Sequence, residues 1–176
     1  MGKCIDYIKS DLYRYAGNVS VGTFLKSYLK IPAFRYQVAF RLVKGNNILG
    51  HILWILRNKS KITLYKNTEV GFGLYIGHGG PVVIHPTTVI GNNVNLGQFT
   101  TIGSNKGKAA TIGNNVYIGP NCCIVEDVSI GNNATIGAGS VVTKDIPENA
   151  TAVGNYAKVI NFDNPGQYIV NKWIKM

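Results

Sequence analysis

TIGNNVYIGPNCCIVEDVSIGNNATIGAGSVV, residues 111–142, is the stretch that decides the fold of this chain. An aliphatic residue recurs at every sixth position of it, and Gly usually follows that residue. The recurring residues are Ile112, Ile118, Ile124, Ile130, Ile136 and Val142. A period of six matches neither the 3.6 residues of a helix nor the two residues of a strand. It predicts a solenoid in which each six-residue unit forms one short strand and one turn.

The same period extends toward the N-terminus, so the predicted solenoid covers residues 62–147. Its earlier members are Leu64, Val70, Ile76, Ile84, Ile90, Leu96 and Ile102. Three units would close one triangular coil, and the aliphatic side chains would point inward and stack on those of the next coil. The motif IGNN begins at residues 90, 112 and 130. Its Gly and Asn residues suit turn conformations that a Cβ opposes.

Two breaks interrupt the period. Ile76 and Ile84 are eight positions apart, with the insertion in GHGG, 77–80; Ile102 and Ile112 are ten apart, with the insertion in GSNKGKAA, 103–110. Since a coil cannot absorb extra residues, we expect both insertions to bulge outward as loops. The first loop carries His78.

The repeats resemble those of the hexapeptide-repeat acyltransferases. Within that family, GHGGPVVI, residues 77–84, is similar to a stretch of the serine acetyltransferases in which Asp-His-Ala-Thr-Gly precedes three aliphatic residues. The resemblance implies a mainly β fold, a left-handed parallel β-helix that assembles as a homotrimer, with an N-terminal α-helical region. It also aligns His78 with the catalytic histidine. We expect Gly79, Gly80 and His85 to contact the substrate, although His85 could instead cap its own turn.

The implied chemistry is acetyl transfer from acetyl-CoA to a hydroxyl group. A hydroxyl attacks a thioester only as a base removes its proton, and a histidine with an unperturbed pKa of about 6.5 is available for this near neutral pH. Backbone N–H groups of a Gly-rich turn can stabilise the charge that develops on the thioester oxygen. Cys122 falls in an inward position of its repeat, so we expect it to be a core residue.

A separate segment predicts the site of the donor. IGAGSVVTKDIPENATAVGNYAKVI, residues 136–160, resembles the closing segment of many hexapeptide acyltransferases, where small residues let the CoA arm approach the backbone. The candidate CoA-binding residues are Gly103, Lys108, Gly119, Gly137, Ala138, Gly139, Thr143, Lys144 and Lys158. The alternative is that these glycines only form turns and the lysines only face solvent. Residues 148–176 are expected to close the CoA site.

The acceptor is predicted from departures from serine acetyltransferase. The resemblance places Gly77 and Thr63 where that family has Asp, and puts Ala109 near a second histidine of the family. Because these groups would hold a zwitterion, their loss favours a neutral sugar hydroxyl, as in the O-acetyltransferases of capsular and other surface polysaccharides. The alternative is serine O-acetyltransferase. A further alternative is a non-catalytic β-helix scaffold.

Residues 1–61 predict a basic helical region. Ser10 and Ser20 are possible N-caps, Pro32 suits a first helical turn, and Gly45 ends that helix. Residues 1–66 hold 12 Lys and Arg against two Asp, and therefore the whole net charge of +10. This region is expected to cap the solenoid. A sharper hypothesis adds docking to an anionic membrane surface.

Other classes of function are disfavoured. The three Cys residues show no metal or disulfide spacing and follow no secretory signal, so we expect a cytoplasmic protein, which the membrane hypothesis would place at the inner membrane face. No motif for nucleic-acid binding accompanies the positive charge. A zinc site like that of the hexapeptide-fold carbonic anhydrases needs three histidines, and only His78 and His85 are suitably placed. We therefore expect no metal.

Overall fold

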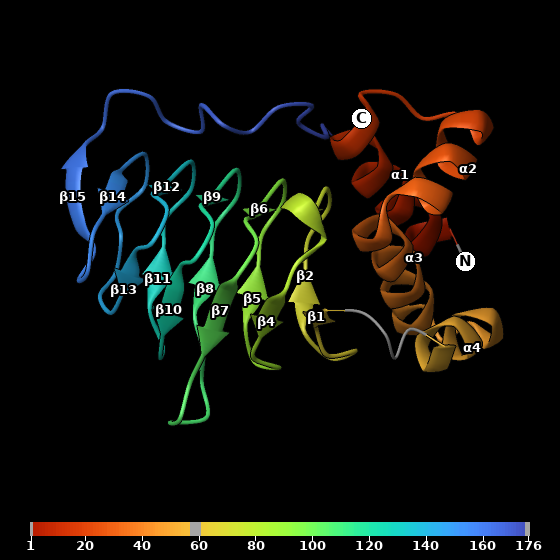
Figure 1. The fold of residues 1–176 in the computed structure, drawn as a ribbon, viewed down its shortest axis with the longest axis horizontal. Coiled ribbons are helices and arrows are strands. Elements are labelled where there is room, and N and C mark those ends of the chain that lie inside the picture. Colours follow the sequence, from red (N-terminus) through yellow and green to blue (C-terminus); the bar gives the residue numbers. More distant parts are fainter. Residues whose placement is uncertain (1, 57–60, 175–176) are drawn as a thin grey trace.

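The computed structural model describes residues 2–56 and 61–174, which form a group of helices followed by a parallel β-solenoid (Figure 1). The predicted mainly β solenoid with an N-terminal helical region is confirmed. The helices are α1 (Gly2–Ala16), α2 (Val21–Lys30), α3 (Pro32–Lys44) and α4 (Ile48–Leu56). They pack against the first coil, at one end of the solenoid. The predicted junction at residue 61 directly follows residues 57–60, which lie outside the described part.

Three sheets form the walls of the solenoid. Sheet A consists of β1 (Ile62–Thr63), β4 (Val82–Ile84), β7 (Thr100–Gly103), β10 (Cys123–Val125) and β13 (Val141–Val142). Sheet B consists of β2 (Glu69–Val70), β5 (Val89–Ile90), β8 (Thr111–Ile112) and β11 (Ser129–Ile130). Sheet C consists of β3 (Tyr75–Ile76), β6 (Asn95–Leu96), β9 (Tyr117–Ile118), β12 (Thr135–Ile136), β14 (Thr151–Val153) and β15 (Lys158–Asn161). The strands pair in parallel, except that β15 runs antiparallel to β14.

The aliphatic residues that recur at every sixth position form the core of the solenoid. The recurring aliphatic side chains lie opposite one another in successive coils, as in the pairing of Ile102 with Ile84 and Ile124. All thirteen of them are buried. Cys122 is buried in the same core, as predicted, and burial raises the pKa of its thiol. Stacked aliphatic side chains that are withdrawn from water give the solenoid its main stabilisation.

The motif IGNN stabilises one corner, between sheets B and C. The first Asn of each motif accepts a hydrogen bond from the backbone of the preceding coil; for example, the Asn92 N–H donates to Asn114 Oδ1 at 2.8 Å. The second Asn has a positive φ, which Asn tolerates better than most residues (φ 56° at Asn115). Its side chain joins a ladder in which Asn115 Nδ2 donates to Asn133 Oδ1 at 3.0 Å.

Side chains of the helices satisfy the exposed backbone edge of the first coil. Arg41 of α3 donates to the carbonyl oxygens of Val70 and Gly71, and its guanidinium also forms a bidentate buried ion pair with Asp11 of α1. Tyr36 of α3 both donates to and accepts from the backbone of Leu64. An open strand edge is a site for unwanted pairing, so the helices act as the cap that the sequence predicted.

The helix ends agree only partly with the predicted caps. Ser20 caps α2, where its side chain accepts from the Thr23 N–H, and α3 begins at Pro32 and ends before Gly45. The prediction for Ser10 is wrong, because this residue lies inside α1. Its hydroxyl donates to the Tyr7 carbonyl oxygen and accepts from the Gly73 N–H. Ser10 therefore links α1 to the first coil instead of starting a helix.

The C-terminal residues run back along the solenoid to the helices (Figure 1). Gly166 N–H donates to the Asn133 carbonyl oxygen, and the Trp173 N–H donates to Asn93 Oδ1. This path follows the corner between sheets B and C. Among the described helices, none is long and apolar enough to cross a membrane.

Candidate functional site

His78 lies in a strained turn between β3 and β4. Its φ is 54° and its ψ is 12°, inside the short 3₁₀ turn Gly77–Gly79. The two residues that follow, Gly79 and Gly80, also have positive φ angles. A left-handed conformation costs a residue with a Cβ about 1–2 kcal/mol. Such strain is often found at functional sites, and here it projects an exposed imidazole from the coil.

The strand that precedes His78 is fixed to α1 by Tyr15. The Tyr15 hydroxyl accepts from the Ile76 N–H at 3.0 Å and donates to the Ile76 carbonyl oxygen at 3.2 Å. Its ring also lies against that of Tyr75, with 4.6 Å between the centroids. Burial raises the pKa of the Tyr15 hydroxyl, which therefore stays protonated. Tyr15 thus holds the strand before His78 both by its backbone at Ile76 and by the side chain of Tyr75.

No hydrogen bond within the described part of the chain orients the His78 imidazole. Glu69 lies on β2 in sheet B and shares a surface depression with Lys44 and Arg41. Because His78 follows sheet C, Glu69 and His78 lie on different walls of the solenoid.

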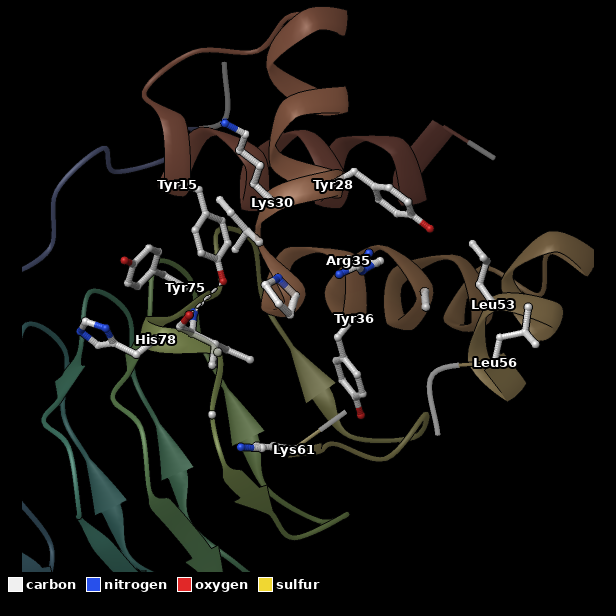
Figure 2. Close-up of a pocket in the computed structure, with 16 residues that line it drawn as sticks. Tyr15, Tyr28, Lys30, Arg35, Tyr36, Leu53, Leu56, Lys61, Tyr75 and His78 are labelled. Carbon is white, nitrogen blue, oxygen red and sulfur yellow. Dashed lines mark hydrogen bonds between the residues drawn. The ribbon is translucent and has the colours of Figure 1, made fainter. Parts of the chain in front are cut away.

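A cavity of about 940 Å³ opens beside His78, between the helices and the first coil (Figure 2). His78, Gly79 and Gly80 line it together, so the structure brings these three predicted residues to one site. His85 does not line this cavity. It follows β4 at the next corner, where its Nδ1 lies 3.0 Å from Thr87 Oγ1 and accepts from the Thr87 N–H. That geometry corresponds to the turn-capping alternative.

The cavity also has a wall that the sequence analysis did not identify. Arg35 of α3 and Lys61 before β1 line it, together with Tyr28 of α2 and Leu53 of α4. They come from three different helices and from the segment before β1, and no local motif links them to His78. Only the docking of the helices on the first coil brings them together.

The candidate CoA-binding residues form two rows that flank sheet A. The first row lies at the corner between sheets C and A, in line with Gly77, and contains Gly119, Gly137, Ala138 and Gly139. The second row lies at the corner between sheets A and B and contains Gly103, Thr143 and Lys144. Lys158 lies on β15, near the end of the solenoid. Residues 164–173 run along the third corner, so of the segment 148–176 only the first part lies near these rows.

Coil packing explains some of these glycines without a ligand. A Cβ at Gly119 would lie 2.7 Å from the Ala138 N atom, and one at Gly137 would lie 2.6 Å from Val153 Cγ1. A lack of space does not explain why residue 103 is Gly, because a Cβ there would meet no atom of the described chain within 4 Å. Among these three glycines, Gly103 is therefore the one whose small size the packing leaves unexplained.

Outward-facing side chains of sheet A form a row between these two corners. Thr63, Val83, Thr101, Cys123 and Val141 lie opposite one another in successive coils. All are exposed or half-buried, and the row is free of charged side chains. The sequence contained a signal for it, since each of these residues directly precedes an inward-pointing aliphatic residue.

The second insertion is an ordered loop that projects after β7 (Figure 1). The Glu126 carboxylate accepts hydrogen bonds from Ser104 Oγ at 2.7 Å and from the N–H groups of Asn105 and Lys106. These bonds hold the pKa of Glu126 below its ordinary value, the hydroxyl of Ser104 contributing most. Lys108 forms an exposed ion pair with Asp127 at 3.0 Å. The described residues contain no group of three side chains suited to a metal ion.

Comparisons with known proteins agree with this geometry. The family "Bacterial transferase hexapeptide (six repeats)" matches residues 109–144. The chain carries the repeat of the bacterial hexapeptide transferases. It is 39% identical over 106 residues to serine acetyltransferase of Helicobacter pylori, covering 58% of this chain and 62% of that protein. It is 33% identical over 152 residues to the chloroplastic serine acetyltransferase 1 of Arabidopsis thaliana, covering 81% of this chain and 47% of that protein.

Solved structures of serine acetyltransferases are similar to this chain over most of its length. Serine acetyltransferase of Neisseria gonorrhoeae in complex with serine has a TM-score of 0.74 at 28% identity, over 91% of this chain and 70% of that one. A serine acetyltransferase in complex with CoA has a TM-score of 0.73 at 25% identity, over 90% and 70%. The chain thus spans about three fifths or less of the length of these curated relatives, and 70% of the length of each of the two solved chains.

These similarities correct the predicted acceptor. The expected sugar hydroxyl of a surface polysaccharide is contradicted, because the relatives and the similar structures are serine acetyltransferases. The prediction was wrong because it relied on charges missing at Gly77, Thr63 and Ala109. The structure shows that charged groups reach the site from the helices as well, so three positions on the coils do not define the acceptor.

Proposed function

We propose that this chain transfers an acetyl group from acetyl-CoA to the hydroxyl of L-serine, with His78 as the general base. One observation carries the proposal: the strained, exposed His78 lies beside a large cavity, in a fold shared over 91% of the chain with a serine acetyltransferase solved with serine. The similarity to a structure solved with CoA supports the same donor here.

In the proposed reaction, the serine hydroxyl oxygen attacks the thioester carbonyl carbon while the neutral imidazole of His78 accepts its proton. A C–O bond forms and the C–S bond then breaks. The proton passes from the imidazolium to the departing thiolate, which leaves as the thiol of CoA. The products are O-acetylserine and CoA, and no cysteine nucleophile takes part. Holding both substrates in position would supply much of the rate enhancement.

For the donor, we propose that acetyl-CoA lies along the outward row of sheet A. The row is uncharged, as the pantetheine arm requires, and is flanked by the two rows of candidate residues. Gly103 offers open space at one edge, and the exposed Lys144 offers a cation for a phosphate group. A homotrimer, as the family resemblance implies, would place this row against a neighbouring subunit.

The test is the release of CoA thiol from acetyl-CoA with L-serine as the acceptor. His78→Asn is the matched variant, because Asn tolerates the left-handed backbone better than Ala does. Loss of a general base costs about 10²–10⁴ in rate, so kcat should fall by that factor while the fold, checked by circular dichroism, is kept. Turnover that His78→Asn leaves unchanged would exclude His78 as the base. Turnover with an oligosaccharide but not with serine would overturn the proposal that serine is the acceptor.

A further inference from the structure

The cavity beside His78 is strongly one-sided in charge. Lys30 at the end of α2, Arg35 on α3 and Lys61 before β1 line it, and no Asp or Glu is among its lining residues. Two ion pairs occur within the described residues, Arg41 with Asp11 and Lys108 with Asp127. The three cations of the cavity therefore have no acidic partner in that part of the chain. A concave site lined by one sign of charge concentrates ligands of the opposite sign.

The size of the cavity exceeds what free serine needs. Its volume of about 940 Å³ lies at the upper end of the roughly 300–1,000 Å³ of pockets that bury drug-sized ligands. One molecule of liquid water takes up about 30 Å³, so an amino acid as small as serine would fill only a fraction of the space. A larger acceptor could touch His78 and the helices at the same time.

The wall of the cavity opposite His78 combines cations with apolar and aromatic groups. Figure 2 shows Arg35 between Tyr28 and Tyr36, with Leu53 and Leu56 beyond it, and Lys61 across the cavity. Arg35 and Lys61 are exposed, so both cations are accessible to an anionic ligand that enters the cavity. Arg is also suited to bidentate binding of carboxylate and phosphate groups.

We infer that this cavity is the acceptor site and that it also admits, besides serine, larger hydroxyl compounds whose carboxylate or phosphate binds Arg35 and Lys61. The inference rests on the proposed function and names its substrate more closely. The reacting hydroxyl of such a compound lies at His78, and its anionic group lies toward the helices. Serine, as the smallest such hydroxyl compound, occupies only the part next to His78.

Two matched pairs of acceptors test this inference. Glycyl-L-serine carries a carboxylate that glycyl-L-serinamide lacks, and glycerol 3-phosphate carries a phosphate that glycerol lacks. With the full chain, we expect kcat/KM to be at least about tenfold higher for one charged member than for its neutral counterpart, as the loss of a charge-assisted hydrogen bond predicts. The pair that shows this preference distinguishes carboxylate from phosphate. Arg35→Gln and Lys61→Gln should each abolish most of the preference, whereas the control Lys26→Gln, on α2 outside the cavity, should not.

Binding without acetyl-CoA separates the two proposals. Calorimetric titration should show that the wild type binds the preferred charged compound and that Arg35→Gln binds it at least about tenfold more weakly. Binding of this kind without any acetyl transfer would reject the proposed function and keep the anion site. Equal binding of the charged and neutral members of both pairs would overturn the inference, whatever the turnover. So would Arg35→Gln and Lys61→Gln variants that bind like the wild type but sediment differently, since the cavity would then be an interface between subunits.

Discussion

At the scale of single residues, a strained turn carries the residue that we propose as the general base. His78 adopts a conformation that Gly or Asn would adopt more easily, in a turn whose next two residues are both Gly. Tyr15 fixes the backbone of Ile76 just before it and so keeps the turn from relaxing. The imidazole stands clear of the coil at the edge of the cavity.

The strain at His78 predicts opposite effects of two substitutions on stability. His78→Gly should leave the free energy of unfolding unchanged or raise it by up to about 1 kcal/mol, since Gly accepts a positive φ without cost. His78→Val should lower it by about 1–2 kcal/mol, because a β-branched residue is strongly disfavoured there. Urea unfolding of both variants measures the difference. Equal stabilities of the Gly and Val variants would mean that the turn is not strained.

At the scale of elements, sheet A and the loop after β7 define the proposed donor site. The period of six predicted both, because it fixes which side chains face outward and where the chain must bulge. The role of Glu126 in holding the loop was not predictable in this way. Its carboxylate reaches residues 20 to 22 positions earlier in the sequence, one coil away.

The loop should depend on the charge of Glu126. Since the folded-state pKa of Glu126 is lowered, its ionised form stabilises the loop. That stabilisation is complete above the ordinary glutamate pKa of about 4.3 and disappears as the pH falls through the lower folded-state pKa. Hydrogen-exchange protection of the Lys106 amide, measured by NMR from pH 3 to pH 6, should follow this course. Glu126→Gln should lack the protection throughout that range; protection independent of pH in the wild type would contradict the account.

Cys123 provides a reporter for the proposed donor site. It is an exposed member of the outward row, whereas Cys122 is buried. In a Cys4→Ser background, a maleimide should modify Cys123 readily, and saturating acetyl-CoA, whose own thiol is blocked, should slow the reaction at least about tenfold, because a bound ligand excludes the reagent. A rate that acetyl-CoA does not change would place the donor elsewhere.

At the scale of the whole molecule, the fold was predictable and the acceptor site was not. The period from Leu64 to Val142 specifies a solenoid whatever the helices do, and a break in it exposes His78. Arg35 and Lys61 join His78 only after the helices dock on the first coil, through long-range contacts such as those of Arg41 with the carbonyl oxygens of Val70 and Gly71. A repeat pattern carries no information on such docking, and for that reason the sugar acceptor was wrongly preferred.

Docking to an anionic membrane stays a prediction. The helices expose a row of apolar side chains on α2, namely Val21, Leu25 and Leu29, beside basic residues. Apolar and basic groups together favour anionic lipid surfaces. The wild type should float with phosphatidylglycerol vesicles at low salt and much less in high salt. The double variant Leu25→Gln/Leu29→Gln should stay at the bottom, while the control Phe162→Gln, an exposed apolar site near the C-terminus, should float. A wild type that stays at the bottom at low salt would refute the prediction.

The most direct test of the account follows the acetyl group itself. The wild type and His78→Asn would each be incubated with ¹³C-acetyl-CoA and L-serine, and the products followed by NMR. The account predicts that the label moves to the serine oxygen as an ester, with one CoA thiol released for each ester formed, and that His78→Asn forms about 10²–10⁴-fold less of it. Label that stays on CoA, or that appears only as free acetate, in the presence of folded wild-type protein would contradict the claim that this chain acetylates serine.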